Sequence, residues 1–273
     1  MLPNRYDAEG AARRCYQWRR RILDISQVSG PLHIAPSFSC LEMVDAVYYG
    51  LFRDNPNGSG SDQFLMSKGH SGIAQYVALE SLGVISADDL RLYCKPSGRL
   101  GTHPALDSPG IVAATGSLGH GLPMAVGLAL AQHIQEVCGT VYVLAGDGEL
   151  QEGSMWESAL LAANLGLSNL VMLIDNNDYE GLAKLSESHP HFYPLEEKFT
   201  AFGWAVGTVD GHKPADIVEA VETREVGKPF ALVCKTVKGH GVSFMIDSPI
   251  WHYRAPNAEE YRQALAELEA TLP

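Results

Sequence analysis

The sequence is short of positive charge. It contains 20 Lys and Arg residues against 32 Asp and Glu residues, which gives a formal net charge of −12. A chain this acidic repels a phosphate backbone unless its basic residues gather in one patch. The one dense basic run lies between Arg13 and Arg21, and we interpret it as the solvated face of a helix. We therefore expect no nucleic-acid partner.

Paired cysteines and long apolar runs are also missing. The five cysteines are odd in number, widely spaced and without a CxxC pair, which favours a reducing compartment over disulfides or structural zinc. The longest apolar stretches fall far below the roughly 18 residues that a membrane helix requires. No N-terminal signal segment is visible. These features predict a cytoplasmic protein with no membrane partner.

The composition is that of a folded, loop-rich protein. Apolar residues make up 46% of the 273 residues, which excludes a disordered chain, and 27 Gly and 15 Pro suit many loops. We find no internal repeat, low-complexity tract or linker, and we predict a single domain over residues 1–273. We expect an N-terminal helical and loop region (about 1–110), a sheet core (about 111–236) and a C-terminal loop and helix (about 237–273).

The first part of the chain is expected to be mainly helical. Apolar residues recur at helical spacing in residues 7–28, 40–51, 70–82 and 87–94. A loop with Gly30 and Pro36 separates the first two of these helices, and Ser86 is a plausible N-cap of the last. A surface turn is predicted at 55–61. The loop at 95–109 has a length that usually indicates a functional segment.

The second part alternates between strands and helices. Short apolar runs predict buried strands at residues 141–145, 170–174, 204–209 and 230–234. Helices are predicted at residues 122–133, 154–165, 214–225 and, capped by Asn257, 258–269. This order predicts an α/β fold with a doubly wound, mostly parallel sheet flanked by helices.

Polar residues follow two of these strands directly. Gly146-Asp147-Gly148-Glu149 follows the first, and the polar cluster that ends at Asp178 follows the second. Ligands of parallel sheets bind beyond the carboxyl ends of the strands, where Asp147 and Asn177 could reach one ion. Their hard oxygens suit Mg²⁺ or Ca²⁺ and leave coordination sites for phosphate. An ordinary strand-to-helix turn is the alternative.

A second glycine-rich segment, Thr115 to Gly121, precedes the predicted helix at 122–133. Such a loop can cradle an anion at the helix N-terminus or allow close packing of helix and sheet, and the spacing does not separate the two. Histidines also gather on loops and helix starts, at His33, His70, His103, His120, His240 and His252. They would serve proton transfer or phosphate binding if the fold brings them together.

Several segments together resemble one enzyme family. GDGELQEG (146–153) and LVMLIDNN (170–177) resemble the thiamine diphosphate signature of transketolases, with thirty residues from Asp147 to Asn177. Further transketolase-like segments follow in the family's order, namely SKGH (67–70), THP (102–104), TGSLGHG (115–121), KGHGVSFM (238–245) and WHYRAP (251–256). The set resembles transketolase more than deoxyxylulose-phosphate synthase or 2-oxoacid dehydrogenases.

The resemblance implies a thiamine-diphosphate-binding domain and assigns roles within it. Asp147, Asn177 and the backbone carbonyl of Tyr179 would hold Mg²⁺, or Ca²⁺ or Mn²⁺ in its place. The cofactor would be bound by Gly116, Ser117, Leu118, Asp147, Gly148, Glu149, Asn177 and His252. In this set the diphosphate would lie on Gly148 and His252, and the aminopyrimidine side on the glycine-rich loop.

The resemblance also implies four catalytic residues. His70 would lie near the diphosphate, and His103 would face the substrate. Glu152 corresponds to an acidic residue in the proton network that links two active sites across a dimer. His33 corresponds to the substrate-facing histidine of the family's SGH motif, with two residues inserted before it and Ala35 and Pro36 where glycines are usual.

The family's pyrimidine-binding domain, which supplies the glutamate that activates the cofactor, has no matching segment here. The resemblance thus implies the N-terminal subunit of a split transketolase, with a partner that carries the pyrimidine and C-terminal domains in an α2β2 assembly. The expected activity is transfer of a two-carbon ketol unit from a ketose to an aldose, as sugars or sugar phosphates. Another thiamine-dependent carboligase with a 2-oxoacid or unusual sugar donor is one alternative, and a non-catalytic relic that only binds a partner is another.

Overall fold

The computed structural model describes residues 6–53 and 61–272, and its centre is a parallel sheet. The five strands lie in the order β1-β2-β3-β7-β6 and all pair in parallel. Their bounds are Gln63–Met66 (β1), Val141–Gly146 (β2), Leu170–Asn176 (β3), Ala205–Asp210 (β6) and Phe230–Lys235 (β7). The predicted α/β class with a mostly parallel sheet is confirmed. Strand β1 is an element that the sequence did not reveal, since it is only four residues long.

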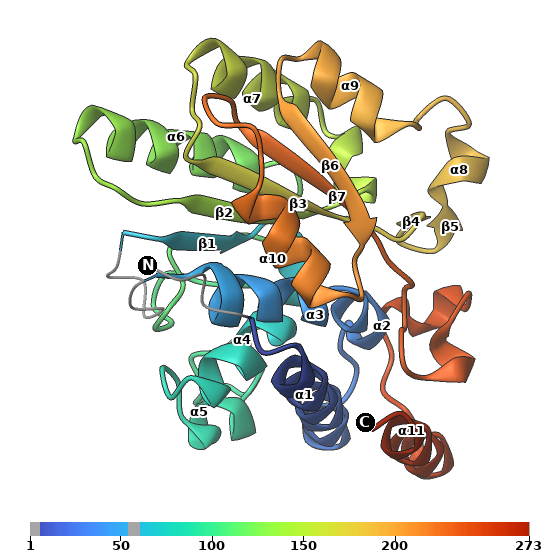
Figure 1. Ribbon diagram of the computed structural model, residues 1–273. Helices are drawn as coiled ribbons and strands as arrows, with labels where there is room; N and C mark the ends of the chain where they lie inside the picture. Colours follow the sequence, from blue (N-terminus) through green and yellow to red (C-terminus); the bar gives the residue numbers. More distant parts are fainter. Residues whose placement is uncertain (1–5, 54–60, 273) are drawn as a thin grey trace.

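Helices cover both faces of the sheet (Figure 1). One face carries α6 (Gly121–Ile134), α7 (Gly153–Asn164) and α9 (Leu195–Ala201). The other carries α3 (Leu41–Asp45), α4 (Gly72–Ser81) and α10 (Pro214–Glu222), with α1 (Ala8–Ser29), α5 (Ala87–Arg91) and α11 (Ala258–Ala270) packed further out. Short elements between these are α2 (Ile34–Phe38), the hairpin of β4 (Tyr179–Glu180) and β5 (Ala183–Lys184), and α8 (Leu185–Ser188).

Alternation along the strands supplies two hydrophobic cores. Tyr142 and Leu144 of β2 face the core beneath α1, α3 and α4, whereas Val141 and Val143 face the core beneath α6 and α7. Successive side chains of a strand point to opposite faces, so a sheet covered on both sides needs apolar residues at every position. Strands β2 and β3 are accordingly buried along their whole length.

Several predicted boundaries need correction. The segment expected as a loop after residues 7–28 contains α2, where Pro36 lies in the first turn and its missing N–H is not required. The helix predicted at 40–51 divides into α3 and a π-helix at Ala46–Leu51. The helix predicted at 87–94 ends at Arg91, and Cys94 has a φ of 56°, which a helix cannot contain. Helix α10 ends at Glu222 rather than at 225.

The caps predicted at Ser86 and Asn257 are confirmed, because each forms a capping box. The surface turn predicted at 55–61 lies, except for its last residue, outside the described residues. The single-domain assignment over residues 1–273 stays a prediction. Among residues 6–53 and 61–272, no helix combines the length and apolar character needed to cross a bilayer.

The basic run between Arg13 and Arg21 is a solvated face only in part, because Arg13 and Arg20 are exposed and the other arginines are not. Arg14 binds the buried carboxylate of Asp45 through two nitrogens, and Arg19 lies buried against Glu42. Arg21 pairs with Glu80 of α4. For these three arginines the interpretation was wrong, because their partners come from other helices, which the local pattern does not contain.

Candidate functional site

A cavity of about 430 Å³ opens at the carboxyl ends of β2 and β3. Predicted site residues that line it are His70, Gly116, Leu118, Asp147, Gly148, Glu149, Glu152, Asn177, Tyr179 and His252. His33, His103 and Ser117 lie beside it and do not line it. The fold therefore gathers at one place residues that are up to 182 positions apart in the chain (252 − 70).

Asp147 follows β2 and is only 1% exposed. Its Oδ2 accepts hydrogen bonds from the Asp178 backbone N–H (2.7 Å), the Asn176 amide (2.8 Å) and the Tyr193 hydroxyl (2.9 Å). Burial, together with the nearby charge of Asp175, raises the pKa of Asp147 to about 6. A buried carboxylate in this state gains from a bound cation, since a positive charge favours the ionised form.

Two further oxygens belong to residues that follow β3 and line the same cavity as Asp147. The Asn177 Oδ1 accepts from the Tyr179 backbone N–H at 3.1 Å. The Tyr179 carbonyl lies against Gly148, since a Cβ on Gly148 would be 3.0 Å from that oxygen. A carboxylate, an amide oxygen and a backbone carbonyl are hard ligands, so this donor set fits a divalent cation such as Mg²⁺.

The glycines of the loop at 115–121 allow close packing. Gly116 has a φ of 129°, and a Cβ there would lie 2.7 Å from the His103 ring. A Cβ on Gly121 would lie 2.1 Å from the Ser67 Oγ. Gly116 and Leu118 also line the cavity, so the loop supports packing and presents its backbone to a ligand space. The two interpretations that the sequence left open are thus compatible.

Glu149 lines the cavity and connects the glycine-rich loop to the carboxyl ends of β1 and β2. Its buried carboxylate accepts from the Ser67 hydroxyl at 2.6 Å, the Gly119 N–H at 3.0 Å and the Gly146 N–H at 3.3 Å. All three donors belong to the protein. We therefore expect Glu149 to act on the cofactor mainly through the loops that it holds.

Three histidines meet at one side of the cavity. The ring of His33 lies 5.3 Å from that of His70 and 5.1 Å from that of His252, between ring centroids. Burial lowers the pKa of His33 to about 4 and that of His252 to about 3, so both are neutral near pH 7. The Nδ1 atoms of His33 and His252 are buried and find no hydrogen-bond partner within the described residues. Such orphaned atoms are those that a ligand would satisfy.

His103 packs on the glycine-rich loop at Gly116, and its carbonyl accepts from the Tyr76 hydroxyl. Tyr253, which the sequence did not single out, packs on His33 with ring centroids 4.7 Å apart and is half exposed. Glu152 is exposed, is the N-cap residue of helix α7 and lies beside Gly119. The exposed side of the site thus carries His103, Glu152 and Tyr253.

Two buried lysines at the cavity were not predicted as site residues. The signal was present, since Lys68 belongs to the SKGH segment and Lys238 to the KGHG segment. Lys68 is 2% exposed, and its ammonium donates to the Asp175 carboxylate and to the Pro36 carbonyl. Lys238 is 5% exposed, donates to the Gly181 carbonyl at 2.7 Å and lies over the Tyr179 ring. Burial, and then the charge of Lys68, lowers the pKa of Lys238 to about 8. Two lysines beside a candidate cation site suit a ligand with several anionic oxygens.

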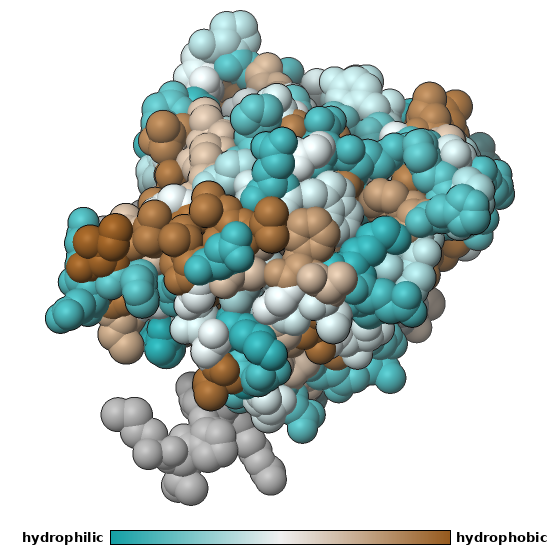
Figure 2. Space-filling model, turned by 90° about the horizontal axis from the view of Figure 1, so that it is seen from above, coloured by the Kyte–Doolittle hydropathy of each residue, from teal (hydrophilic) through white to brown (hydrophobic). Residues whose placement is uncertain are grey.

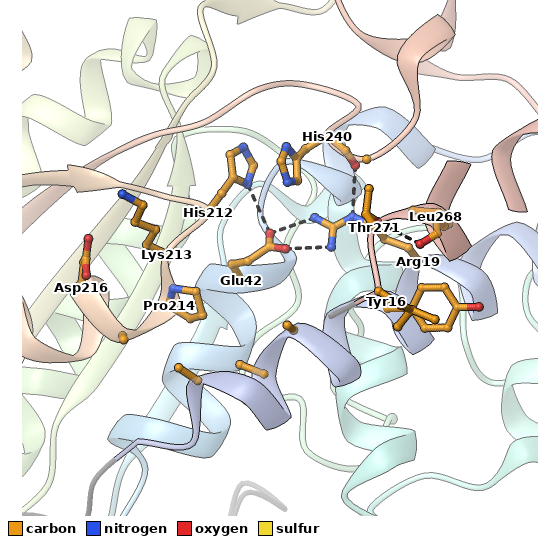
Figure 3. A pocket seen from close by; sticks show the side chains of 16 residues that line it. Tyr16, Arg19, Glu42, His212, Lys213, Pro214, Asp216, His240, Leu268 and Thr271 are labelled. Atoms are coloured by element: carbon orange, nitrogen blue, oxygen red, sulfur yellow. Dashed lines mark hydrogen bonds and ion pairs between the residues drawn. The ribbon is translucent and has the colours of Figure 1, made fainter. Parts of the chain in front are cut away.

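His240 and His120 do not join this cluster. His120 is exposed, with its Nδ1 near the Leu118 carbonyl. His240 lies in a second cavity with Glu42 and His212 (Figure 3), and these three side chains could be taken for metal ligands. The His212 and His240 rings stack at 3.6 Å and 13°, so their nitrogen lone pairs do not converge. Glu42 is already paired with Arg19, and the cluster is better described as a hydrogen-bonded network.

Comparison with known proteins agrees with this geometry. Residues 18–268 match the family described as transketolase, thiamine diphosphate binding domain. The chain is 36% identical over 255 residues to one subunit of the apulose-4-phosphate transketolase of Phocaeicola vulgatus, a match that covers 92% of this chain and 90% of that protein. It is 37% identical to the 6-deoxy-6-sulfo-D-fructose transketolase subunit SqwG of a Clostridium strain, over 87% of this chain and 88% of that one.

Solved structures give the same answer for the fold. The transketolase of Leishmania mexicana superposes on 95% of this chain with a TM-score of 0.84 and 26% identity. The chain spans only 41% of that protein, and about the same share of the Campylobacter jejuni transketolase, whose TM-score is 0.86. The family predicted from the sequence motifs is confirmed: the chain belongs to the transketolase family, as a member of its thiamine diphosphate binding domain.

Proposed function

We propose that this chain is the cofactor-binding subunit of a two-subunit transketolase, which transfers a two-carbon ketol unit from a ketose donor to an aldose acceptor. The extent of the matches carries this proposal. The chain covers 90% of the Phocaeicola vulgatus relative, whose name makes it one subunit of its enzyme, whereas it covers 41% of the Leishmania mexicana transketolase. A second subunit would supply the remaining domains, including the one that contacts the cofactor's pyrimidine ring.

In this proposal the cavity at the ends of β2 and β3 holds thiamine diphosphate and one divalent cation. Asp147, Asn177 and the Tyr179 carbonyl would bind Mg²⁺, with Ca²⁺ or Mn²⁺ as substitutes. The diphosphate would lie between this cation, the Gly148 N–H and the two buried lysines, near His70 and His252. The backbone of Gly116 to Leu118, including Ser117, would face the aminopyrimidine side. When bound, the cofactor supplies a nucleophilic carbon and an electron sink for the two-carbon unit.

The chain's own residues would bind the sugar and handle protons. The neutral His33 can accept a hydrogen bond from a sugar hydroxyl at its orphaned Nδ1. His103 would face the substrate from the glycine-rich loop. Glu152 is exposed beside that loop, which suits a contact with another subunit.

An apolar band supports the presence of a partner subunit. Figure 2 shows this band on the face formed by α6 and α7, where Ile134, Leu160 and Leu161 are about half exposed or more. Apolar surface of this kind on helices usually marks a protein interface. We propose an α2β2 assembly in the cytoplasm, a location that the free cysteines suit.

Reconstitution tests the proposal. The purified chain, with and without its partner, thiamine diphosphate and Mg²⁺, is assayed with ketose phosphates, unphosphorylated ketoses, hydroxypyruvate and pyruvate as donors. We expect turnover of a ketose only when both subunits are present, and none with D147N. Full turnover by this chain alone would contradict the two-subunit assignment, and absence of cofactor binding in the assembled protein would indicate a non-catalytic relic.

A carboligase with a 2-oxoacid or unusual sugar donor is the second candidate. The observation that favours it is the packing of Tyr253 on His33, which places an aromatic ring against the histidine that would face the substrate. The donor panel separates the two, because a preference for pyruvate over every ketose would select the second.

A further inference from the structure

Lys238 lines the cofactor cavity, and backbone hydrogen bonds fix the residues before and after it in the chain. This segment follows β7, and its backbone makes three contacts with distant parts of the chain. The Val237 N–H donates to the His212 Nε2 at 2.9 Å, and the Gly239 N–H donates to the Ala35 carbonyl at 3.0 Å. The His240 carbonyl accepts from the Arg19 Nε at 3.1 Å.

Two of these three contacts lead to one buried network behind the cavity (Figure 3). The His212 Nδ1 lies 3.3 Å from Glu42 Oε2, and Arg19 binds both oxygens of Glu42 at 2.7 and 2.9 Å. Arg19 and Glu42 are 5% and 7% exposed. Although burial opposes ionisation, Arg19 and His212 hold the pKa of Glu42 well below its usual value, so the pair is ionised.

The proton positions in this network follow from its donors. The His212 Nε2 accepts the Val237 N–H, so it carries no proton, and the proton of the neutral ring is on Nδ1, where it donates to Glu42. Glu42 thereby fixes the His212 tautomer whose Nε2 can accept the Val237 N–H. Stacking of the His240 ring on His212 restricts its orientation as well.

We propose that Arg19, Glu42 and His212 form a positioning network that fixes the backbone around Lys238 and thereby sets the affinity of the cavity for the diphosphate. None of the three lines the cofactor cavity, so they act through Lys238. A lysine has a flexible four-carbon stem and a strongly hydrated ammonium, so keeping that ammonium buried is costly and depends on where its backbone is fixed. This inference rests on the proposed function, since it takes thiamine diphosphate as the ligand.

The test uses the complex with the partner subunit and measures the dissociation constant of thiamine diphosphate with Mg²⁺ by calorimetry. In H212Q the amide oxygen can replace Nε2 and still accept the Val237 N–H, whereas H212N places its amide at the Nδ1 position and loses that contact. We expect about tenfold weaker binding for H212N, the usual effect of one lost hydrogen bond, and near-normal binding for H212Q. Thermal unfolding confirms that each variant is folded.

A double-mutant cycle with K238M shows whether His212 acts through Lys238. If it does, H212N has no further effect in the K238M background. K213M is the matched control, because Lys213 lines the same rear cavity and its ammonium pairs with the exposed Asp210. Two outcomes overturn the proposal. In one, the fold-losses in affinity of H212N and K238M multiply in the double variant. In the other, H212Q binds thiamine diphosphate no better than H212N. Failure of the wild-type complex to bind thiamine diphosphate would instead overturn the proposed function.

Discussion

Lys68 and Asp175 form a buried ion pair directly beneath the candidate cofactor cavity, although 107 positions separate them in the chain. Lys68 follows β1, and Asp175 belongs to β3, with β2 between them. Burial alone would raise the pKa of Asp175, but Lys68, Ser39 and Thr236 lower it below its usual value. The Lys68 ammonium is thus fixed at the cavity, and its attraction to Asp175 compensates the cost of burying both charges.

Removal of one partner of this pair should destabilise the chain strongly. We expect K68M to lower the free energy of unfolding by about 3–5 kcal/mol, because it leaves the Asp175 charge buried and unpaired. Urea denaturation measures the change. As a control, K228A removes the exposed pair with Glu225 and should cost less than about 1 kcal/mol. Equal effects of the two substitutions would contradict the importance of burial here.

The glycine-rich loop gives a second prediction. G116A should destabilise the chain by more than about 1 kcal/mol, because the residue has a positive φ and its Cβ would meet the His103 ring. G127A in α6 is the control, since a Cβ there meets nothing within 4 Å and should stabilise the helix by about 0.5–1 kcal/mol. Chemical denaturation of the isolated chain compares the two, and a neutral G116A would show that the loop can relax.

The hydrogen bonds of Glu149 give a third prediction. E149Q replaces a carboxylate that accepts three hydrogen bonds by an amide with one accepting oxygen, so one of the Gly119 or Gly146 N–H groups faces another donor. We expect a loss of about 1–3 kcal/mol in stability and weaker cofactor binding. Unfolding and calorimetry on the same preparations measure both. Q151A is a suitable control, since Gln151 is exposed at the same turn; an E149Q protein as stable as Q151A would refute the prediction.

The histidine cluster predicts a dependence of stability on pH. Burial lowers the folded-state pKa of His33 to about 4 and of His252 to about 3, below the ordinary value near 6.5. Between these values the two histidines bind more protons in the unfolded chain than in the folded one, so their contribution to stability rises as pH increases from about 4 to 6.5 and falls on acidification. We expect H33N/H252N to flatten this part of the stability curve, measured by thermal unfolding across pH. The exposed H120N should leave the slope unchanged.

The sequence alone was enough to predict the fold class, the family and the residues of the candidate cofactor site. Short apolar runs that end in polar residues indicated parallel strands, and the pair Asp147 and Asn177 predicted a cation site at their ends. These signals are local, since the periodicity of a strand and the residues that follow it are contained in a few consecutive positions. Together with the histidine and glycine segments they were enough to identify the family.

Only the tertiary structure decided which side chains meet. The arginines near the start of the chain had a solvated face as their simplest interpretation, yet Arg19 contacts His240, 221 positions away. The same holds for Lys68 with Asp175, and for His33 with His252 and Tyr253. A buried charge or an orphaned ring nitrogen takes its properties from partners that folding brings from distant segments, and no local pattern in the sequence contains those partners.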